Sequence, residues 1–283
     1  MGYSILSRHQ IKHMRQVGRL AAETLMLVGE SLRPGMTTNE IDTLVHSHTL
    51  KHGARPAPLN YGASRGRPGF PKSVCTSVNE VVCHGIPDDR PLEDGDLLNV
   101  DVTSVLPPGA RGWHGDTNAT FYIGEPSKEA KHLVEITREC LELGVSVVRP
   151  GAHIGDIGAI IQEHAEKNGC SVVREYTGHG IGRVFHCEPQ VCHVGVHGTG
   201  VRIKKGMCFT IEPMINLGDW RVELLQDQWT VITSDRALSA QFEHTIVVTD
   251  DGAEVLTQRP GLLTNSEDRP WSRPGKLTGP RGR

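Results

Sequence analysis

The stretch RPGMTTNEIDTLVHSHTLKHG, residues 33–53, recurs in outline as RPGAHIGDIGAIIQEHAEKNG, residues 149–169. Both stretches open with Arg-Pro-Gly, place apolar residues and a histidine at matching positions, and close with a glycine, all at one fixed offset. A turn of this kind before an amphipathic segment that ends at glycine is typical of the second helix of a helical hairpin. Chance similarity between two helix pairs is the alternative, but agreement at this many positions favours a duplicated unit.

A longer helix is expected before each of these turns. Ser7 and Thr37 are each followed three residues later by Gln or Glu, which is the pattern of a capping box at a helix N-terminus. In the second copy, a helix is expected from Ser127 to about Val148. The first helix has an apolar face that consists of Ile11, Met14, Val17, Ala21, Leu25 and Val28.

Sequence typical of β-strands follows each helical pair. Residues 97–106 alternate, with Leu98, Val100 and Val102 on one face and polar residues on the other. A Pro-Pro-Gly turn leads to a return strand over 116–123, and similar strands are expected around 207–215 and 241–248. The sequence therefore predicts an α+β fold with two helix-plus-sheet halves, about residues 7–123 and 124–257, that share one core.

The composition is that of a soluble globular protein. Of 283 residues, 37 % are apolar and 22 % charged, and the net charge of −3 gives no basic field for DNA or other nucleic acid. No apolar run is long enough to span a membrane, and residues 1–9 lack the apolar region of a signal peptide. The seven cysteines form no C-x-x-C pair. Free thiols in a reducing compartment are expected, and hence a cytoplasmic protein.

Each half also contains a histidine followed by two acids. These residues are His84, Asp101 and Asp116 in the first half and His186, Glu212 and Glu243 in the second, with His179 shortly before His186. The acids lie in expected strands, next to β-branched or aromatic residues. Any one of them taken alone could equally face solvent on the opposite side of its strand. Four acids in matching places favour a common site.

Convergence of four carboxylates has an electrostatic consequence. Without cations they would raise one another's pKa values, at a cost on the order of several kcal/mol. Two divalent cations would balance the four negative charges. A site of mostly oxygen ligands with one imidazole suits Mn, Fe(II), Co or Zn. It differs from a structural zinc site, which is built from thiolates. Two ions bridged by carboxylates lower the pKa of a shared water toward neutrality, and the resulting hydroxide can attack a carbonyl.

Eight segments in order along the chain resemble those of bacterial methionine aminopeptidases of type I. They are KSVCTSVNE (72–80), VCHGIP (82–87), NVDV (99–102), HGDT (114–117), TGHGIG (177–182), FHCEPQ (185–190), FTIEPM (209–214) and SAQFEHT (239–245). The resemblance runs from about Ser7 to Thr257. It implies the duplicated pita-bread fold of peptidase family M24, a curved antiparallel sheet covered by two helix pairs, in one catalytic domain over residues 1–257.

The resemblance also implies a set of metal ligands. Asp101 would chelate one divalent ion, and His179 and Glu212 would hold the other. Asp116 and Glu243 would bridge the two ions, which would be Co, Mn, Fe(II) or Zn. The glycines around His179 would let the backbone pass close to this site.

The implied reaction is removal of the initiator methionine from nascent proteins whose second residue is small and uncharged, by a hydroxide that bridges the two metals. Glu212 would act as general base, His186 would stabilise the oxyanion and His84 would hold the substrate near the scissile amide. The methionine pocket would consist of Tyr61, Phe70, Cys75, His84, Phe185 and Trp229. Without the family, either histidine is better read as structural and the aromatic residues as core.

The chain departs from the family pattern in two loops. Residues 62–68 lengthen a loop that borders the pocket, and about four extra residues occupy the turn 107–112. The spacing between His186 and Glu212 leaves no room for the helical insert of type II enzymes. Residues 258–283 are rich in Pro and Arg, which predicts a disordered tail. That tail would either contact the ribosome transiently, where nascent chains emerge, or remain solvated, and the protein would be a monomer.

Two other functions are alternatives for a chain of this fold. A proline-specific peptidase of the same fold, such as prolidase or aminopeptidase P, would carry a sizeable domain ahead of the catalytic half, whereas the repeat begins here within the first ten residues. A binding protein that has lost catalysis would lack a ligand, and all five metal positions are filled. The aminopeptidase interpretation is therefore preferred.

Overall fold

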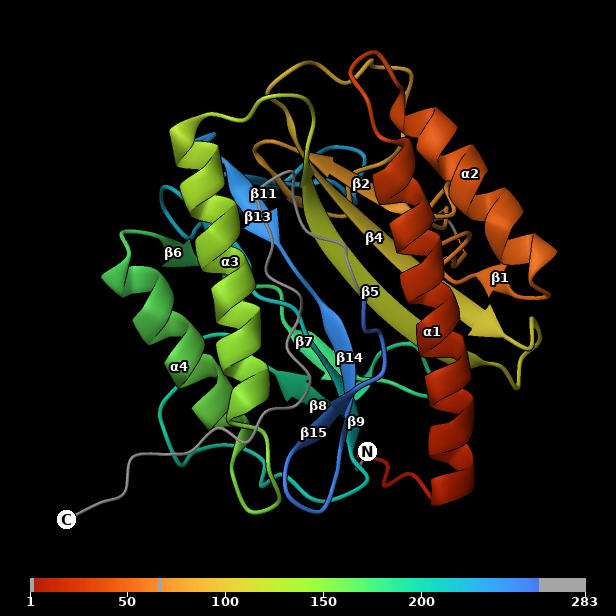
Figure 1. Ribbon diagram of the computed structural model, residues 1–283, viewed down its shortest axis with the longest axis vertical. Coiled ribbons are helices and arrows are strands. Elements are labelled where there is room, and N and C mark those ends of the chain that lie inside the picture. Colours follow the sequence, from red (N-terminus) through yellow and green to blue (C-terminus); the bar gives the residue numbers. More distant parts are fainter. Residues whose placement is uncertain (1–2, 66–67, 260–283) are drawn as a thin grey trace.

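Two helix pairs organise the fold in the computed structural model, which describes residues 3–65 and 68–259 (Figure 1). The first pair is α1 (Arg8–Ser31) and α2 (Thr38–Lys51), and the second is α3 (Lys128–Ser146) and α4 (Ile154–Lys167). Figure 1 shows α1 and α2 beside the strands of the first half, and α3 and α4 beside those of the second. The helical hairpins and their duplication are confirmed.

The strands form small antiparallel sheets. In the first half, β4 (Leu97–Leu106) pairs with β1 (Arg55–Pro56), β2 (Cys75–Val78) and β5 (Trp113–Tyr122). In the second half, the order β15-β14-β9-β7-β8 joins Ala253–Val255, His244–Val248, Cys208–Ile211, Gly178–Gly180 and Cys187–Val191. Two three-stranded sheets complete the set: β13 (Ser239–Gln241), β10 (Met214–Asn216) and β6 (Ser171–Val172), and β11 (Val222–Leu224), β12 (Val231–Thr233) and β3 (Val81–Cys83).

Both predicted capping boxes are present. The Ser7 hydroxyl accepts from the backbone N–H of Gln10, the Thr37 hydroxyl accepts from that of Glu40, and each Gln or Glu side chain reaches back to the N-cap. Ser127 caps α3 as expected. The predicted apolar face of α1 packs against β4 and β5, and all of its members but the half-buried Ile11 are buried. Local sequence therefore sets where the helices begin and which face they bury.

The β4–β5 hairpin carries acids on the face opposite the core. Leu98, Val100 and Val102 of β4 are buried in the main hydrophobic cluster, as the alternation predicts. The register places Cys75 opposite Asp101 and Thr103 opposite Asp116, so these side chains project together from the other face. The extra residues 107–112 form the turn between β4 and β5 and only lengthen the tip of this hairpin.

The two halves meet along β5 and β14, which run through the middle of Figure 1. Hydrogen bonds join them: the Thr117 hydroxyl donates to the Glu243 carbonyl at 2.9 Å, and the Glu243 N–H donates to the Asn118 carbonyl at 3.1 Å. The Thr245 hydroxyl donates to the Asp116 carbonyl at 2.8 Å. Asp116 and Glu243, one from each half, therefore lie at the seam.

Glu212 and Glu243 do not lie within strands, contrary to the sequence prediction. The strand expected over 207–215 is divided into β9 and β10 at Glu212 and Pro213, and that over 241–248 into β13 and β14 at Phe242 and Glu243. Proline has no N–H for a strand ladder, which accounts for the first break. A residue at a break between strands is not bound to the alternation of side chains along a strand. The side chains of Glu212 and Glu243 both point toward the seam from such breaks.

The tail begins later than the sequence suggests. Arg259, which the sequence places in the predicted disordered tail, is buried, and its guanidinium donates to the Thr117 hydroxyl and to the Asn118 carbonyl, both at 2.7 Å. Nothing in the local sequence around Arg259 indicates that this side chain folds back onto the seam. The remainder of the predicted tail, residues 260–283, lies outside the described residues.

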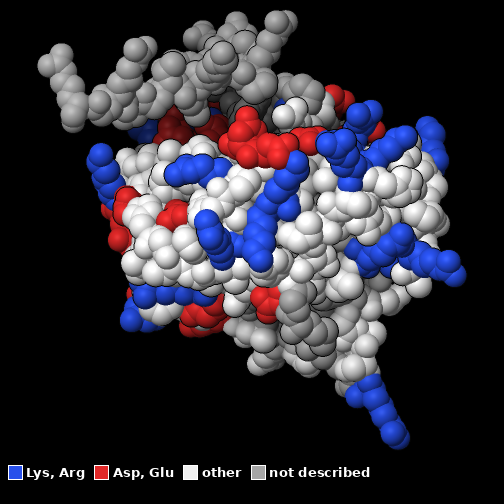
Figure 2. Space-filling model, turned by 90° about the horizontal axis from the view of Figure 1, so that it is seen from below, with Lys and Arg blue, Asp and Glu red and all other residues white. Residues whose placement is uncertain are grey.

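The described surface is mixed in charge on the face that Figure 2 presents, where Lys and Arg side chains are dispersed among uncharged ones. Among residues 3–65 and 68–259, no helix has the length and apolar character needed to cross a bilayer.

Candidate metal centre

The five predicted ligands converge at the seam. One ligand atom each from Asp116 in β5, His179 in β7 and Glu243 before β14 lie within 4.8 Å of one another. His179 Nε2 is 3.5 Å from Asp116 Oδ2 and 3.6 Å from Glu212 Oε1. Burial raises the pKa of Asp101 in β4, and Asp101 lies close enough to the Asp116 carboxyl for that carboxyl to raise the pKa further. Residues from both halves thus form one group of carboxylates and an imidazole.

Two oxygens of this group lack hydrogen-bond partners. Asp101 Oδ1 and Glu243 Oε1 are both buried, and no donor in the described chain reaches either atom. An unpartnered buried carboxylate oxygen is costly, since it has lost its hydration without replacement. Cations ligated by these oxygens would remove that cost. The donor set, oxygen-rich with one imidazole, therefore fits divalent metal ions.

The pKa values describe the same electrostatic situation. Burial raises the pKa values of Asp101 and Glu243, and the neighbouring Asp116 raises both further. Burial also raises the pKa of Glu212, to about 7. Burial alone would lower the pKa of His179, but its hydrogen bond to Asp116 and the charge of Glu212 reverse the direction. Without cations the group would therefore retain protons at neutral pH.

A hydroxyl group orients Asp116 and an amide group orients Glu243, the two acids at the seam. Asp116 Oδ1 accepts from the Thr103 hydroxyl at 2.7 Å, across the β4–β5 register. Glu243 Oε2 accepts from the Asn118 amide at 2.9 Å, across the seam. Each acid thus keeps one oxygen fixed by the protein while the other faces the centre.

Glu212 is oriented by three residues that sequence analysis did not single out. Its Oε1 accepts from the Thr210 hydroxyl at 2.7 Å and its Oε2 from the Gln241 amide at 3.2 Å. Its backbone N–H donates to Nε2 of the buried His193 at 3.0 Å. Thr210 and Gln241 occur within the quoted motifs FTIEPM and SAQFEHT, so the motifs were a usable signal, whereas His193 had none.

His186 lies at the rim of the centre and is held by aromatic neighbours. Its ring is 4.1 Å from that of His179 and stacks on Phe185 at 4.0 Å. The Tyr61 hydroxyl is 2.7 Å from His186 Nδ1. Desolvation, followed by the charge of His179, lowers the pKa of His186, while burial raises that of Tyr61. A neutral imidazole that accepts from the phenol is the state these shifts favour.

His84 reaches the centre from the end of β3. It adopts a left-handed backbone conformation, with φ of 57°, which is uncommon for a residue with a side chain and is often found at functional sites. Burial lowers its pKa to about 4, so the imidazole is neutral at pH 7. Its ring meets the edge of Tyr176, 5.5 Å away.

The remaining predicted pocket residues form two contacts near the centre. The Phe70 and Trp229 rings meet edge to face at 5.4 Å, and the Tyr61 and Phe185 rings at 5.1 Å. Cys75 is buried opposite Asp101, and burial raises its pKa well above the ordinary value, so it is a neutral thiol. Tyr61 and Phe185 thus join the ring contacts that lead to His179, and Cys75 lies opposite Asp101, while the methionine pocket itself stays a prediction.

The glycines beside His179 are required by close backbone packing. A Cβ at Gly178 would lie 2.5 Å from the Thr210 carbonyl oxygen, and one at Gly180 would lie 2.0 Å from that of Glu188. Neither separation is possible for a real side chain. The two glycines let β7 pass between β8 and β9 and carry His179 to the centre.

A comparison with protein families agrees with this geometry. The model of metallopeptidase family M24 matches residues 12–250. The chain belongs to the M24 metallopeptidase family. The matched segment contains all five residues of the carboxylate group, so the expected family is confirmed.

Similar M24 proteins cover nearly the whole chain. Methionine aminopeptidase A of Synechocystis sp. is 53 % identical over 90 % of this chain and 97 % of its own length. Methionine aminopeptidase of Salmonella typhimurium is 48 % identical over 94 % of this chain and all of its own. The crystal structure of methionine aminopeptidase from Rickettsia prowazekii covers 91 % of this chain and 100 % of its own, with a TM-score of 0.86 and 50 % identity.

More distant members of the family share the fold alone. The prolidase from Pyrococcus furiosus has a TM-score of 0.71 but only 20 % identity, and the match covers 90 % of this chain and 65 % of the prolidase. The pita-bread architecture implied by the family resemblance is therefore common to both groups.

Proposed function

We propose that this protein is a methionine aminopeptidase that removes the N-terminal methionine of nascent proteins whose second residue is small and uncharged. The observation that carries the proposal is the match to methionine aminopeptidases, at about half identity over nearly the full length of both chains. The convergence of Asp101, Asp116, His179, Glu212 and Glu243 supplies a site for the chemistry.

We propose that these five residues hold two divalent ions, Co, Mn, Fe(II) or Zn. Asp101 would chelate one ion, His179 and Glu212 the other, and Asp116 and Glu243 would bridge. The two unpartnered oxygens of Asp101 and Glu243 support this arrangement. When bound, such ions lower the pKa of water and polarise a peptide carbonyl.

Glu212 is the proposed general base. In the metal-free protein, burial raises the pKa of this carboxyl to about 7, so it exchanges a proton near neutral pH. The Thr210 and Gln241 hydrogen bonds hold its two oxygens in place, so the carboxylate does not need to reorganise when the proton moves.

His186 is the proposed donor to the oxyanion. If the Tyr61 hydroxyl donates to Nδ1, the proton of the neutral imidazole lies on Nε2, the atom available to a substrate carbonyl. His84, also neutral, would hold the substrate near the scissile amide. The methionine side chain would lie among Tyr61, Phe70, Cys75, His84, Phe185 and Trp229, where Cys75 is a buried neutral thiol.

We also propose the extent, oligomeric state and location of the enzyme. The catalytic domain would span residues 1–257, extended by the docked Arg259, and act as a monomer in the cytoplasm. Its substrates would be the N-terminal peptides of nascent chains, and a transient ribosome contact would involve the basic residues after Arg259. Seven free cysteines support a reducing compartment.

A peptide comparison tests the activity. The purified protein should hydrolyse Met-Gly peptides with added Mn²⁺ or Co²⁺, should leave Met-Lys peptides intact and should lose activity with a chelator. Preferential cleavage of Xaa-Pro peptides would instead support a prolidase-like peptidase. Specific peptide binding without turnover under any metal condition would support a binding protein.

A further inference from the structure

A cavity of about 300 Å³ lies beside the proposed active site, at the start of the lengthened loop 62–68. Its lining combines β1 and the segment that follows with two side chains of the centre's rim. The lining residues used below are Arg55, Asn60, Tyr61, His114 and Phe185.

Arg55 is the only Lys or Arg residue in the lining of the cavity, and no acid of the described chain pairs with it. Its guanidinium makes only a long contact, 3.4 Å, with the carbonyl of Pro56. The residue is half-buried in β1, whose backbone pairs with β4 at Val105. A guanidinium without a carboxylate partner at the wall of a cavity is a ready donor to an anionic ligand.

Two further polar side chains of the lining have a hydrogen-bonding atom without a partner within residues 3–65 and 68–259. The Asn60 amide makes no side-chain hydrogen bond, although its backbone is held at a left-handed φ of 64°. The buried His114 donates from Nδ1 to the Gly182 carbonyl at 2.9 Å, which leaves its Nε2 without a protein partner. The cavity thus offers a charged fork and two neutral hydrogen-bonding groups.

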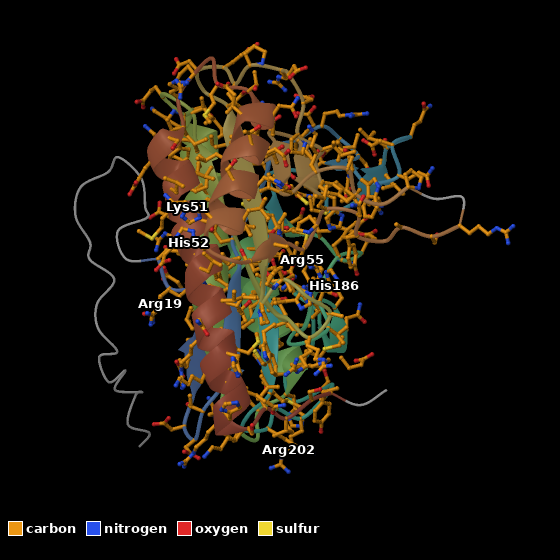
Figure 3. The ribbon with its side chains drawn as sticks, turned by 90° about the vertical axis from the view of Figure 1, so that its right-hand side faces the viewer. Arg19, Lys51, His52, Arg55, His186 and Arg202 are labelled. Carbon is orange, nitrogen blue, oxygen red and sulfur yellow. The ribbon has the colours of Figure 1, made fainter. Side chains whose placement is uncertain are left out.

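The cavity shares walls with the reaction centre. Tyr61 lines it and hydrogen-bonds His186, and Phe185 lines it and stacks between His114 and His186, at 5.5 Å and 4.0 Å. Tyr61 and Phe185 also belong to the proposed methionine pocket, so the two sites adjoin, whereas Phe70 and Trp229 of that pocket are not part of the cavity's lining. Figure 3 shows Arg55 and His186 close together on one side of the molecule, with Arg19 away from them on α1.

We propose that the Arg55 cavity is a substrate subsite that binds the carboxylate of an acidic residue downstream of the scissile bond. The inference rests on the proposed function. The second substrate residue would be small, so the third or a later residue is the first with a side chain long enough to enter the cavity. An extended peptide advances roughly 3.3 Å per residue, so peptides that carry the acid at successive positions present it at different distances from the scissile bond.

A peptide series tests this subsite. Met-Ala peptides carry Glu or Gln at position three, four or five, and kcat/KM is measured for each with saturating Mn²⁺ at low salt. At one position, Glu should be preferred over Gln by about tenfold, the effect of one charge-assisted hydrogen bond. Arg55→Gln should lower that ratio to about one, and Arg55→Lys should restore part of it. Arg19→Gln removes the same charge from α1 and should leave the ratio unchanged.

The other outcomes overturn the subsite. Equal rates for Glu and Gln peptides at all three positions would do so, as would a Glu preference that survives Arg55→Gln. If glutarate or inorganic phosphate binds in an Arg55-dependent manner by calorimetry while the peptides show no preference, the cavity serves a separate anion and not the substrate. Failure of every Met-Ala peptide to be cleaved would count against the proposed function, a result distinct from all of these.

Discussion

Replacement of the buried Arg259 provides a sharp test of how the end of the domain supports the metal centre. Its guanidinium donates to Thr117 and Asn118, both of which also hydrogen-bond Glu243. Burial lowers the pKa of Arg259 to about 10, while the charge of Glu243 opposes that shift, so the side chain is cationic at pH 7. Arg259→Met keeps much of the volume and removes both hydrogen bonds.

The expected loss follows from those two bonds. Hydrogen bonds to a charged group contribute about 1.5 kcal/mol each at the low end of their range, hence a loss of about 3 kcal/mol. The low end applies because neither acceptor is left unpaired: the Asn118 carbonyl keeps the N–H of Glu243, and the Thr117 hydroxyl still donates to the Glu243 carbonyl. For a domain of this size, that loss lowers Tm by about 6–12 °C.

Calorimetric unfolding of the metal-free protein at pH 7 measures the shift. A chain that ends at Arg259 should match the parent, whereas one that ends at Thr257 should be destabilised like Arg259→Met. Arg19→Met, on the exposed face of α1, controls for loss of a cation and should change stability by less than about 0.5 kcal/mol. A Tm for Arg259→Met within about 1 °C of the parent would refute the claim that this side chain secures the seam.

Three further predictions concern the centre itself. The metal-free protein should become less stable from pH 7 to pH 9, because Asp101 and Glu243 have folded pKa values well above their unfolded ones and the stability that their protons contribute is lost as pH rises toward those folded values. The window lies above the unfolded pKa of histidine, since the lowered pKa values of His84 and His186 act in the opposite sense below it. Calorimetry with and without saturating Mn²⁺ checks this, and a stability that rises over that range contradicts it. Mn²⁺ at about 100 times its Kd should stabilise the parent by about 2.7 kcal/mol. In a thermal-shift titration, Asp116→Asn should abolish most of that stabilisation. An undiminished stabilisation of the variant would remove Asp116 from the ligand set. Tyr61→Phe should lower kcat on Met-Ala peptides about tenfold with little change in KM, because His186 loses the bond that sets its tautomer; an unchanged kcat would show that the bond is dispensable.

Local signals account for the parts of the fold that sequence predicted well. Capping hydroxyls at Ser7, Thr37 and Ser127 act within one helical turn, so their outcome does not depend on the rest of the chain. The alternation over 98–103 likewise predicts which side chains of β4 enter the hydrophobic core, although both faces of the strand are buried in the fold. The convergence of the acids required more, namely the repeat and the resemblance, because nothing local brings Asp116 and Glu243 together.

Side-chain positions that depend on the register between strands could not be predicted from the sequence. Glu212 and Glu243 were expected inside strands, yet both lie at interruptions, where a side chain can leave the alternation of the ladder. Thr103 and Asn118 are ordinary strand residues until the hairpin and seam registers place them on Asp116 and Glu243. Their partners become evident only once those registers are known.

The two arginines misjudged or overlooked in sequence illustrate the same limit from the side of charge. A lone arginine is usually solvated, so the sequence places Arg259 in the tail and gives no sign of a role for Arg55. In the fold they differ in a way that matters: Arg259 is enclosed and satisfied by the seam, whereas Arg55 faces a cavity without an acidic partner. A satisfied buried cation is expected to act on stability, and an unsatisfied one beside an active site on the choice of ligand. The Arg259 and Arg55 variants should therefore separate cleanly, the first in Tm and the second in the ratio of rates for Glu and Gln peptides.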